Sequence, residues 1–477
     1  MEPHMTTLQI LRELRRELPA EVVICDPDAM ARYRDDASGE PGGMPLAVLR
    51  PASVDELAAA VRLCNRHAVG IVPQGGRTGL SGGACAHAGG VVVSTERMNG
   101  IIHLDRRAMT LTAWAGTPLQ VIQEAALAAG LEYPVDIGAR GTATIGGTVA
   151  TNAGGIRVIR HGMTRSHVAG LEVVLADSTV IDDLQRLEKD NAGYDLKHLF
   201  TGSEGTLGIV TRVCLRLKHA MPYTETALLG LRDHEAAFAL LEAARAQLGE
   251  SLVAFEGMWP DFFAHVCDEA ALCRAPLAGR QGFYVLVEAA HRSGAGAEGF
   301  HAWLSEMLES GRVEDGAVAR SGADAAALWK IRESVTELHR SFGPHLSFDI
   351  GLPPPVVGHF AEAVAGVLRD RRTLQFGHVG DGNLHLLVAR EAGDTDHDIE
   401  QPVFELVRQW HGTVSAEHGI GLLKRDWLGH SRSPQQRDVM RRIKHGLDPA
   451  GIMNRGKLLT SPSCPESVLE DPTAMSM

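Results

Sequence analysis

Three glycine-rich segments constrain this chain more than any other feature of its sequence. Residues 73–90, 138–162 and 193–208 hold 18 of the 52 glycines, where an average content of about 7% would put roughly 4. Glycine lets a backbone approach a ligand closely and turn its N–H groups towards an anion. Neighbouring hydroxyls would add donors, namely Thr78, Ser81, Thr144, Thr148, Thr151 and Ser203. The clusters favour a large phosphate-bearing ligand, with tight turns in an α/β fold as the alternative.

These glycines form neither of two common nucleotide-binding motifs. The first cluster reads GGRTGLSGG over residues 75–83, which does not match the GxGxxG of a Rossmann fold. Residues 451–457, GIMNRGK, almost match a P-loop, but Leu458 follows where serine or threonine is needed, and Pro449 stands where a strand should lead in. We therefore expect neither fold.

Charge and composition exclude several classes of protein. The net charge is −13 and no basic stripe stands out, so we expect no nucleic-acid partner. No apolar run approaches the roughly 18 residues of a membrane-spanning helix, and the first 18 residues lack the apolar core of a signal peptide. Seven cysteines without CxxC spacing suit reduced thiols. We expect a cytoplasmic protein without a transmembrane segment, and leave peripheral attachment at the inner membrane open.

The residue composition and the expected secondary structure of the chain change near residue 221. Up to residue 220, short β-branched runs alternate with helix signals such as the Ser53-Val54-Asp55-Glu56 capping box, which predicts a mixed α/β domain. From 221 to 420, helical stretches rich in alanine, leucine and glutamate alternate with strands, so we place a domain boundary near Pro222. Residues 421–460 predict a mostly helical segment, and residues 461–477 a frayed polar tail.

One histidine pair has a spacing that suits a metal ion. In the run FGHVGDGNLH over residues 376–385, Asp381-Gly382 is a strong signal for a two-residue hairpin turn. Such a turn would place His378 directly opposite His385, with Cβ atoms about 5 Å apart on one face. Glu417 is available as a third ligand, and two histidines with one glutamate are a usual catalytic zinc set. His418, next to it, would point elsewhere and could act as a base. A polar hairpin without an ion is the alternative.

Four segments of the sequence resemble a known family. The segments PQGGRTGLSGGA (73–84), GTATIGGTVATNAGG (141–155), GSEGTLGIVT (202–211) and DPAGIMNRGK (448–457) are similar to the FAD-linked oxidase superfamily named after vanillyl-alcohol oxidase. Within it, the chain resembles the D-2-hydroxy-acid dehydrogenases, meaning D-lactate and D-2-hydroxyglutarate dehydrogenases, over roughly residues 20 to 460. The resemblance implies an α+β protein with a two-subdomain FAD-binding domain, an α/β substrate-binding cap with an antiparallel sheet, and a helical C-terminal segment that returns to the flavin.

The resemblance also assigns roles to residues. Non-covalent FAD is expected, because the flavin-facing stretch Arg77-Thr78-Gly79 lacks the histidine or cysteine that some members use for attachment. His378, His385 and Glu417 would hold one divalent metal, and His418 would be the base. Zinc is the first expectation, although manganese, iron or cobalt suits the same donors. The expected FAD contacts are Pro73, Gly75, Gly76, Arg77, Thr78, Gly79, Leu80, Ser81, Gly82, Gly141, Thr144, Gly146, Gly147, Thr151, Asn152, Gly154, Gly155, Gly205, Ile209 and Asn454.

The substrate is less closely defined. Arg332 and Thr336 lie four apart in an expected helix over residues 328–340 and so share a face, and the 2-hydroxyglutarate branch carries Arg and Thr at matching positions for the distal carboxylate. That branch usually has Lys where Ser347 stands and Asn where Leu387 stands. Both departures remove polar contacts, which puts a dicarboxylate in doubt and favours a short or apolar D-2-hydroxy acid.

The leading hypothesis is therefore an FAD-dependent, metal-assisted dehydrogenase of a D-2-hydroxy acid. The metal would take the substrate's carboxylate and hydroxyl, His418 would accept the hydroxyl proton, and hydride would pass from the same carbon to the flavin. Electrons would then pass to a quinone or an electron-transfer flavoprotein. A zinc-dependent hydrolase with the same His/His/Glu set leaves the glycine clusters unexplained, and a non-catalytic nucleotide-binding scaffold leaves the histidines idle. A homodimer stays open.

Overall fold

The computed structural model describes residues 3–184, 187 and 189–460, so the expected tail over 461–477 lies outside the described residues. The first subdomain is a four-stranded sheet in the order β1-β2-β4-β3, with β2, β4 and β3 parallel. The first glycine cluster follows β3 directly. The elements are α1 (Pro3–Glu17), β1 (Val23–Ile24), α2 (Pro27–Ala31), β2 (Ala47–Leu49), α3 (Val54–Arg66), β3 (Ile71–Gln74) and β4 (Val91–Ser94).

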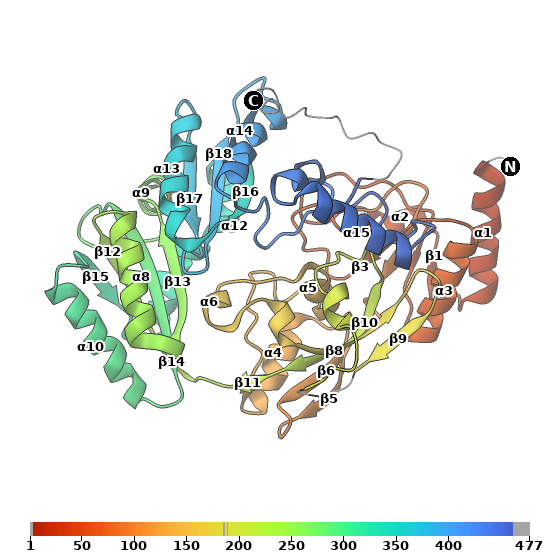
Figure 1. The fold of residues 1–477 in the computed structure, drawn as a ribbon, viewed down its shortest axis with the longest axis horizontal. Coiled ribbons are helices and arrows are strands. Elements are labelled where there is room, and N and C mark those ends of the chain that lie inside the picture. Colours follow the sequence, from red (N-terminus) through yellow and green to blue (C-terminus); the bar gives the residue numbers. More distant parts are fainter. Residues whose placement is uncertain (1–2, 185–186, 188, 461–477) are drawn as a thin grey trace, which may run out of the picture.

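The second subdomain is a five-stranded antiparallel sheet in the order β5-β6-β10-β8-β9. Helix α5 packs against β6 and β10 of this sheet and carries part of the second glycine cluster (Figure 1). The elements are β5 (Ile101–Asp105), β6 (Thr110–Trp114), α4 (Leu119–Ala128), β7 (Leu131–Glu132), α5 (Ile145–Thr151), α6 (Val158–His161), η1 (Thr164–His167), β8 (Val168–Val174), β9 (Val180–Asp183), α7 (Leu196–Phe200), β10 (Ile209–Arg216) and β11 (Lys218–His219).

The cap is a seven-stranded antiparallel sheet in the order β15-β12-β14-β13-β17-β18-β16, covered by helices on both faces. Alternate strand residues divide between the faces, so Val285 belongs to the apolar cluster that contains residues of α8, α10, α13 and α14, while Leu286 belongs to the cluster that contains residues of α9 and α11. The elements are β12 (Tyr223–Leu231), α8 (His234–Leu248), η2 (Gly249–Ser251), β13 (Leu252–Met258), α9 (Pro260–Ala264), η3 (His265–Glu269), β14 (Phe283–His291), α10 (Ala295–Glu309), β15 (Asp315–Val318), α11 (Gly322–Glu333), α12 (Val335–Ser341), β16 (His345–Gly351), η4 (Pro354–Val356), α13 (Val357–Val367), β17 (Thr373–Gly377), β18 (Asn383–Ala389) and α14 (Asp396–Gln409).

The C-terminal segment leaves the cap and returns to the first subdomain (Figure 1). It contains η5 (Arg425–His430) and α15 (Pro434–Leu447), after which Met453 forms a parallel bridge with Ile71 at the start of β3. The predicted α+β fold class is confirmed. Besides the mixed four-stranded sheet, the described strands form antiparallel sheets of five, seven and two strands, the last from β7 and β11. Among the described helices, none is both long enough and apolar enough to cross a membrane.

The helix predicted over residues 328–340 is wrong as a single element. The chain forms α11 up to Glu333 and starts α12 at Val335, with Ser334 between them at φ −67° and ψ 18°. The Ser334 hydroxyl donates to the Lys330 carbonyl at 2.7 Å, a local hydrogen bond of the kind that bends helices. The face expected to be shared by Arg332 and Thr336 therefore does not continue unbroken between them.

Candidate active site between the glycine loops and the cap

The three glycine clusters pack against one another. A Cβ atom on Gly75 would lie 2.2 Å from Thr144 Oγ1, and one on Gly76 would lie 2.0 Å from the Thr142 carbonyl oxygen. The third cluster joins them, because a Cβ on Gly205 would lie 3.0 Å from Pro73 Cγ. No side chain fits at the first two contacts. The glycines therefore bring three distant segments into one continuous loop surface.

The C-terminal segment closes this surface from one side. The Asn454 amide donates to the Gly83 carbonyl at 3.1 Å and to the Glu204 carbonyl at 2.7 Å. The buried Glu204 side chain accepts the backbone N–H groups of Ile420 and Gly421 at 2.8 and 2.7 Å, and burial raises the pKa of this carboxyl. Glu204 thus ties the third glycine cluster to the C-terminal segment, a contact that sequence reasoning missed.

The expected FAD contacts lie at the end of β3, in these loops, in or beside α5, at the start of β10 and, for Asn454, in the C-terminal segment. Several of the hydroxyls expected as ligand donors are used within the chain instead. Ser81 Oγ donates to the His418 carbonyl at 2.9 Å, Thr151 Oγ1 to the Gly147 carbonyl at 3.0 Å, and Thr148 Oγ1 to the Ile145 carbonyl at 2.9 Å. The N–H groups of the loops are thus the stronger candidates for contacting a phosphate.

Three side chains meet beside this surface, those of His378, His385 and Glu417. One ligand atom from each lies within 4.8 Å of the others, and Glu417 Oε2 is 3.5 Å from His378 Nε2 and 3.7 Å from His385 Nε2. Burial alone lowers the pKa of His378, but the Glu256 and Glu417 carboxylates outweigh it and raise the pKa to about 10. Burial and the charge of His378 lower the pKa of His385 to about 3. Nitrogen and carboxylate donors at this spacing fit one divalent cation.

The predicted hairpin register is wrong, although the two histidines still meet. His385 pairs with Phe376, not with His378, and the His378 carbonyl accepts the N–H groups of Asp381, Gly382 and Asn383 at 3.0–3.2 Å. A two-residue turn of the expected type needs positive φ at both central residues, whereas of this pair only Gly382 has it. The longer loop folds the His378 ring back until its centroid lies 5.3 Å from that of His385.

His418 lies beside the cluster and faces a buried aspartate. Asp349, on β16 and 1% exposed, accepts the backbone N–H groups of Glu417 and His418, both at 2.9 Å. Its Oδ2 is 3.7 Å from His418 Nδ1 and 3.6 Å from Lys424 Nζ. Burial raises the pKa of Asp349, but the charges of His418 and Lys424 outweigh it and hold the pKa well below its usual value. Asp349 therefore positions both the backbone and the ring of His418.

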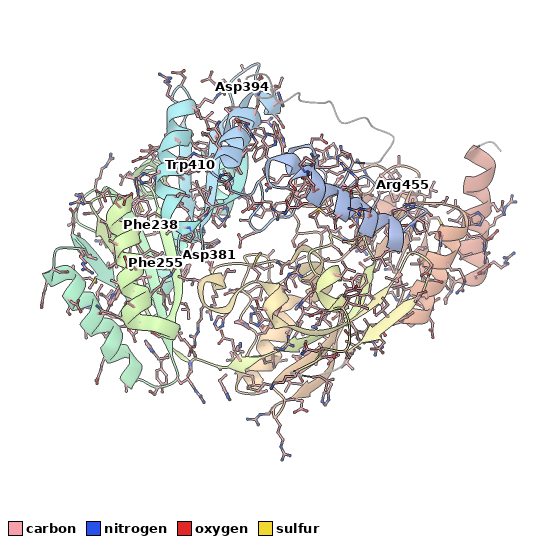
Figure 2. All side chains as sticks on the ribbon, in the orientation of Figure 1. Phe238, Phe255, Asp381, Asp394, Trp410 and Arg455 are labelled. Atoms are coloured by element: carbon pink, nitrogen blue, oxygen red, sulfur yellow. The ribbon has the colours of Figure 1, made fainter. Side chains whose placement is uncertain are left out.

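Glu417 connects the cluster to the glycine loops. The Gly155 N–H donates to Glu417 Oε1 at 2.6 Å, which leaves Oε2 facing the histidines. A cleft of about 440 Å³ opens beside Glu417. Its lining includes Met163 from the FAD-binding domain and Asp381 from the cap. Asp381 lies on the edge of the cap that faces the glycine-rich half (Figure 2).

Arg332 also reaches this region, from α11 on the cap. It is 5% exposed, its Nε donates to Glu256 Oε2 at 2.8 Å, and its guanidinium lies 4.8 Å from the centre of the Phe376 ring. Its Nη2 is buried and has no hydrogen-bond partner among the described residues. Thr336 belongs to α12, and its side chain lies outside the described part.

Ser347 and Leu387, the two departures from the 2-hydroxyglutarate pattern, are direct cross-strand partners. They stand two pairs along from Asp349 and His385, and therefore on the same face of the sheet. Leu387 is 2% exposed and packs in the apolar cluster under α11.

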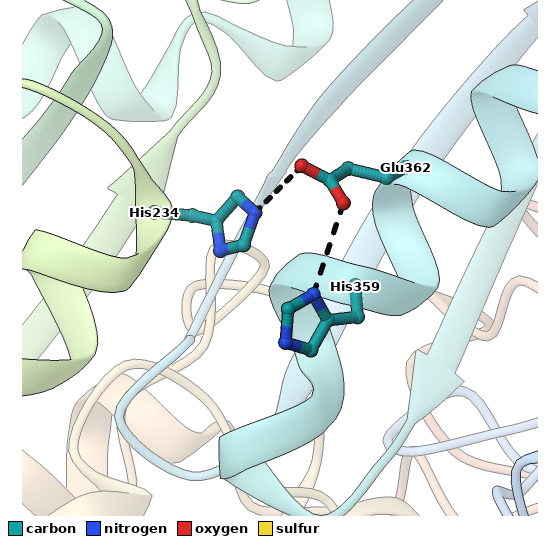
Figure 3. A group of neighbouring side chains, drawn as sticks. All are labelled: His234, His359 and Glu362. Carbon is teal, nitrogen blue, oxygen red and sulfur yellow. Dashed lines mark hydrogen bonds and ion pairs between the residues drawn. The ribbon is translucent and has the colours of Figure 1, made fainter.

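A second group with the same residue types lies on the outer side of the cap. His234 Nε2 is 2.9 Å from Glu362 Oε1, and His359 Nδ1 is 3.7 Å from Glu362 Oε2 (Figure 3). The His359 and Glu362 side chains are 54% and 65% exposed, and each of the two histidines forms an ion pair with Glu362 at the surface. The buried cluster that touches the glycine loops is therefore the better candidate for a catalytic metal.

Comparison with known proteins gives matches along nearly the whole chain. The family model described as FAD binding domain matches residues 45–183, and the model described as FAD linked oxidases, C-terminal domain, matches residues 220–458. The chain belongs to the FAD-linked oxidase family. This confirms the expected resemblance, and this FAD-linked oxidase is an FAD-dependent dehydrogenase.

Two relatives match this chain over more than nine tenths of its length. The oxidase is 39% identical to a D-2-hydroxyglutarate dehydrogenase of Xanthomonas citri pv. viticola, covering 97% of this chain and 99% of that one. It is 38% identical to the mitochondrial D-2-hydroxyglutarate dehydrogenase of Bos taurus, covering 94% and 83%. Among solved structures, p-cresol methylhydroxylase superposes with a TM-score of 0.77 at 14% identity, covering 95% and 97%. The 4-ethylphenol oxidase of Gulosibacter chungangensis gives 0.74 at 17%, covering 96% and 98%. These last two likenesses concern the fold alone.

Proposed function

We propose that this oxidase converts a D-2-hydroxy acid to the 2-oxo acid, with FAD in the glycine-rich loops and one divalent metal, zinc first, held by His378, His385 and Glu417. The observation that carries the proposal is the 2.6 Å hydrogen bond from the Gly155 N–H to Glu417 Oε1, because it joins a cofactor loop to the ligand cluster. A hydrolase with the same three ligands would leave the adjoining glycine-rich loops unexplained.

The residues of the site fit both FAD and a divalent metal. The loop glycines leave no room for side chains where the clusters meet, as a nucleotide cradle requires, and the His/His/Glu donors match a catalytic metal set with an open position. When bound, the metal supplies a Lewis acid that lowers the pKa of the substrate's hydroxyl. FAD supplies the hydride acceptor.

His418 is the residue that we propose as the base. Its Nδ1 faces Asp349, which leaves Nε2 to accept the proton of the substrate's hydroxyl. Its ring lies nearly parallel to that of His385, with centroids 6.1 Å apart, so the base stands beside the ligand cluster. The negative charge of Asp349 favours the protonated ring that this transfer produces.

D-2-hydroxyglutarate is the first candidate substrate. Arg332 offers a buried guanidinium with an unpartnered Nη2, a group suited to a second carboxylate, and the relatives at 36–39% identity are named for that substrate. A D-2-hydroxy acid with an uncharged chain is the second candidate. It is favoured by Leu387, which faces Ser347 and brings no polar contact.

The test is anaerobic bleaching of the yellow enzyme by a panel of D-2-hydroxy acids. We expect D-2-hydroxyglutarate or D-lactate to bleach the flavin, and a chelator to stop the bleaching. Arg332→Met should raise the KM for D-2-hydroxyglutarate but not for D-lactate. A protein that stays colourless after FAD reconstitution would support the hydrolase instead. For the external acceptor we propose a quinone or an electron-transfer flavoprotein, to be tested as reoxidants of the bleached enzyme.

A further inference from the structure

Glu256 is a buried carboxylate that contacts two different parts of the candidate site. It lies on β13 with 1% exposure. Both of its oxygens lie 2.8 Å from His378 Nδ1, and Oε2 also accepts from Arg332 Nε at 2.8 Å. A carboxylate in this position needs such partners, because a buried charge without them is strongly destabilising.

The contact to His378 fixes how that ring is used. With Nδ1 directed at Glu256, Nε2 is left facing Glu417 Oε2 at 3.5 Å. A carboxylate behind a ligating histidine holds the ring in one orientation and makes the distal nitrogen a better donor. Glu256 is therefore placed to act on the metal site through His378, without being a ligand itself.

The contact to Arg332 fixes the second end of the site in the same way. Glu256 occupies Nε, and the Phe376 ring lies under the guanidinium at 4.8 Å. The orientation that results leaves the buried Nη2 without a partner among the described residues. The same carboxylate thus presents both a metal ligand and a carboxylate-binding group.

The backbone around Glu256 is clamped to the loop that carries His378. The Gly380 N–H donates to the Phe255 carbonyl at 3.1 Å. A Cβ on Gly257 would lie 2.6 Å from Val379 Cγ1, and Gly257 pairs with Gly377 in the sheet. The neighbours of Glu256 on both sides are therefore in contact with residues 377–380, so the backbone that carries Glu256 is held against the loop that carries His378.

We propose that Glu256 is a positioning residue that couples metal binding to recognition of the substrate's distal carboxylate. A single negative charge orients His378 and Arg332 together, so a cation at one end and a carboxylate at the other influence each other's affinity, and this coupling is reciprocal. The inference rests on the proposed function for the identity of the substrate, but the effect on the metal does not depend on turnover.

The experiment compares Glu256→Gln with Glu288→Gln in the FAD-loaded full-length protein. Glu288 is a matched control because it is also a buried strand glutamate, 7% exposed, that accepts from Thr226 and Trp329 and has no contact with the ligand cluster among the described residues. Zinc affinity is measured without substrate, by competition with a chromophoric chelator. Loss of a carboxylate that holds a ligating histidine typically weakens metal binding by about 10- to 100-fold, and we expect this for Glu256→Gln only.

The substrate arm measures KM and kcat for D-2-hydroxyglutarate and D-lactate at saturating zinc. Glu256→Gln should raise the KM for the dicarboxylate by about tenfold more than for D-lactate, and Glu256→Asp should restore part of the zinc affinity. Equal zinc affinity in Glu256→Gln and wild type, or an equal loss in Glu288→Gln, would overturn the proposal. If wild type reduces no flavin with any D-2-hydroxy acid, the proposed function fails, while the chelator competition still decides whether Glu256 positions the metal site.

Discussion

Replacing Asp349 with asparagine should slow flavin reduction while leaving the FAD bound. The substitution keeps the shape of the side chain and an oxygen for the backbone N–H groups of Glu417 and His418, but it removes the negative charge 3.7 Å from His418 Nδ1. That charge favours the imidazolium which forms when the base accepts a proton, so its loss acts on the chemical step.

The size of the effect follows from the geometry. Two unit charges 3.7 Å apart attract by roughly 4 kcal/mol at an effective dielectric constant of about 20. The His418 side chain is 27% exposed, so solvent screens part of this, and we take about half, or about 2 kcal/mol. A barrier raised by that amount slows the reaction by about 30-fold.

The assay is anaerobic stopped-flow bleaching of the flavin, with FAD and metal content measured on the same samples. Ser415→Ala is the matched control, because it removes one hydroxyl that donates to Asp349 Oδ2 at 3.1 Å but keeps the charge. A hydrogen bond to a charged group contributes about 1.5–3 kcal/mol to stability, but the charge that favours the protonated His418 ring stays in place, so we expect a much smaller loss of rate than in Asp349→Asn. An Asp349→Asn enzyme within threefold of wild type, or a Ser415→Ala enzyme that is equally slow, would refute the electrostatic account.

Further predictions concern the loops, the metal and pH. Gly76→Ala would place its Cβ about 2.0 Å from the Thr142 carbonyl oxygen and should lower FAD content on purification, whereas Gly138→Ala, with nothing within 4 Å, should keep it; equal FAD content in both would contradict the packed-loop account. His385→Ala should stay yellow but lose the bound metal and the bleaching by substrate. His359→Ala, in the surface group, should keep both, as checked by metal analysis and bleaching assays. Loss of metal in His359→Ala only would show that the metal binds in the surface group instead. Because the folded-state pKa of Asp349 lies below the unfolded value of about 3.9, its ionised form stabilises the fold above that pH and this contribution is lost as the pH falls below it. Thermal melts from pH 6 to 3 should therefore show a steeper loss of stability in wild type than in Asp349→Asn, and parallel curves would argue against the shift.

Part of the site was predictable because it depends on local sequence. The glycine loops were identifiable from residues 73–90 and 138–162, since a dense run of glycines has few uses other than close packing of backbone. The His378/His385 pair followed from its short spacing, whereas Glu417 was added as a residue type that metals prefer and through the family resemblance. Even there the register was wrong, because the turn depends on how the His378 carbonyl is satisfied by three N–H groups, which no dipeptide signal specifies.

The residues behind the site were missed, although a signal existed. Glu256 and Asp349 are single acidic residues inside apolar strands, LVAFEGM over 252–258 and HLSFDIG over 345–351. A charged side chain in a strand that is otherwise buried usually has a specific partner. Their partners come from α11, from the β17–β18 loop and from residues 415–424, and nothing in the sequence pairs segments that far apart.

The sequence by itself determined the family, the glycine-rich loops and the types of side chain in the buried cluster. Those are properties of short segments, in which steric freedom and ligand chemistry belong to the residues themselves. Only the tertiary structure decided that Glu417 meets the second glycine cluster through the Gly155 N–H, and that one buried carboxylate contacts both His378 and Arg332. These contacts join residues from 76 to 262 positions apart, and their partners are selected by how the cap sheet packs against the FAD-binding domain, because burial forces each charge to find whichever opposite group the fold brings within reach.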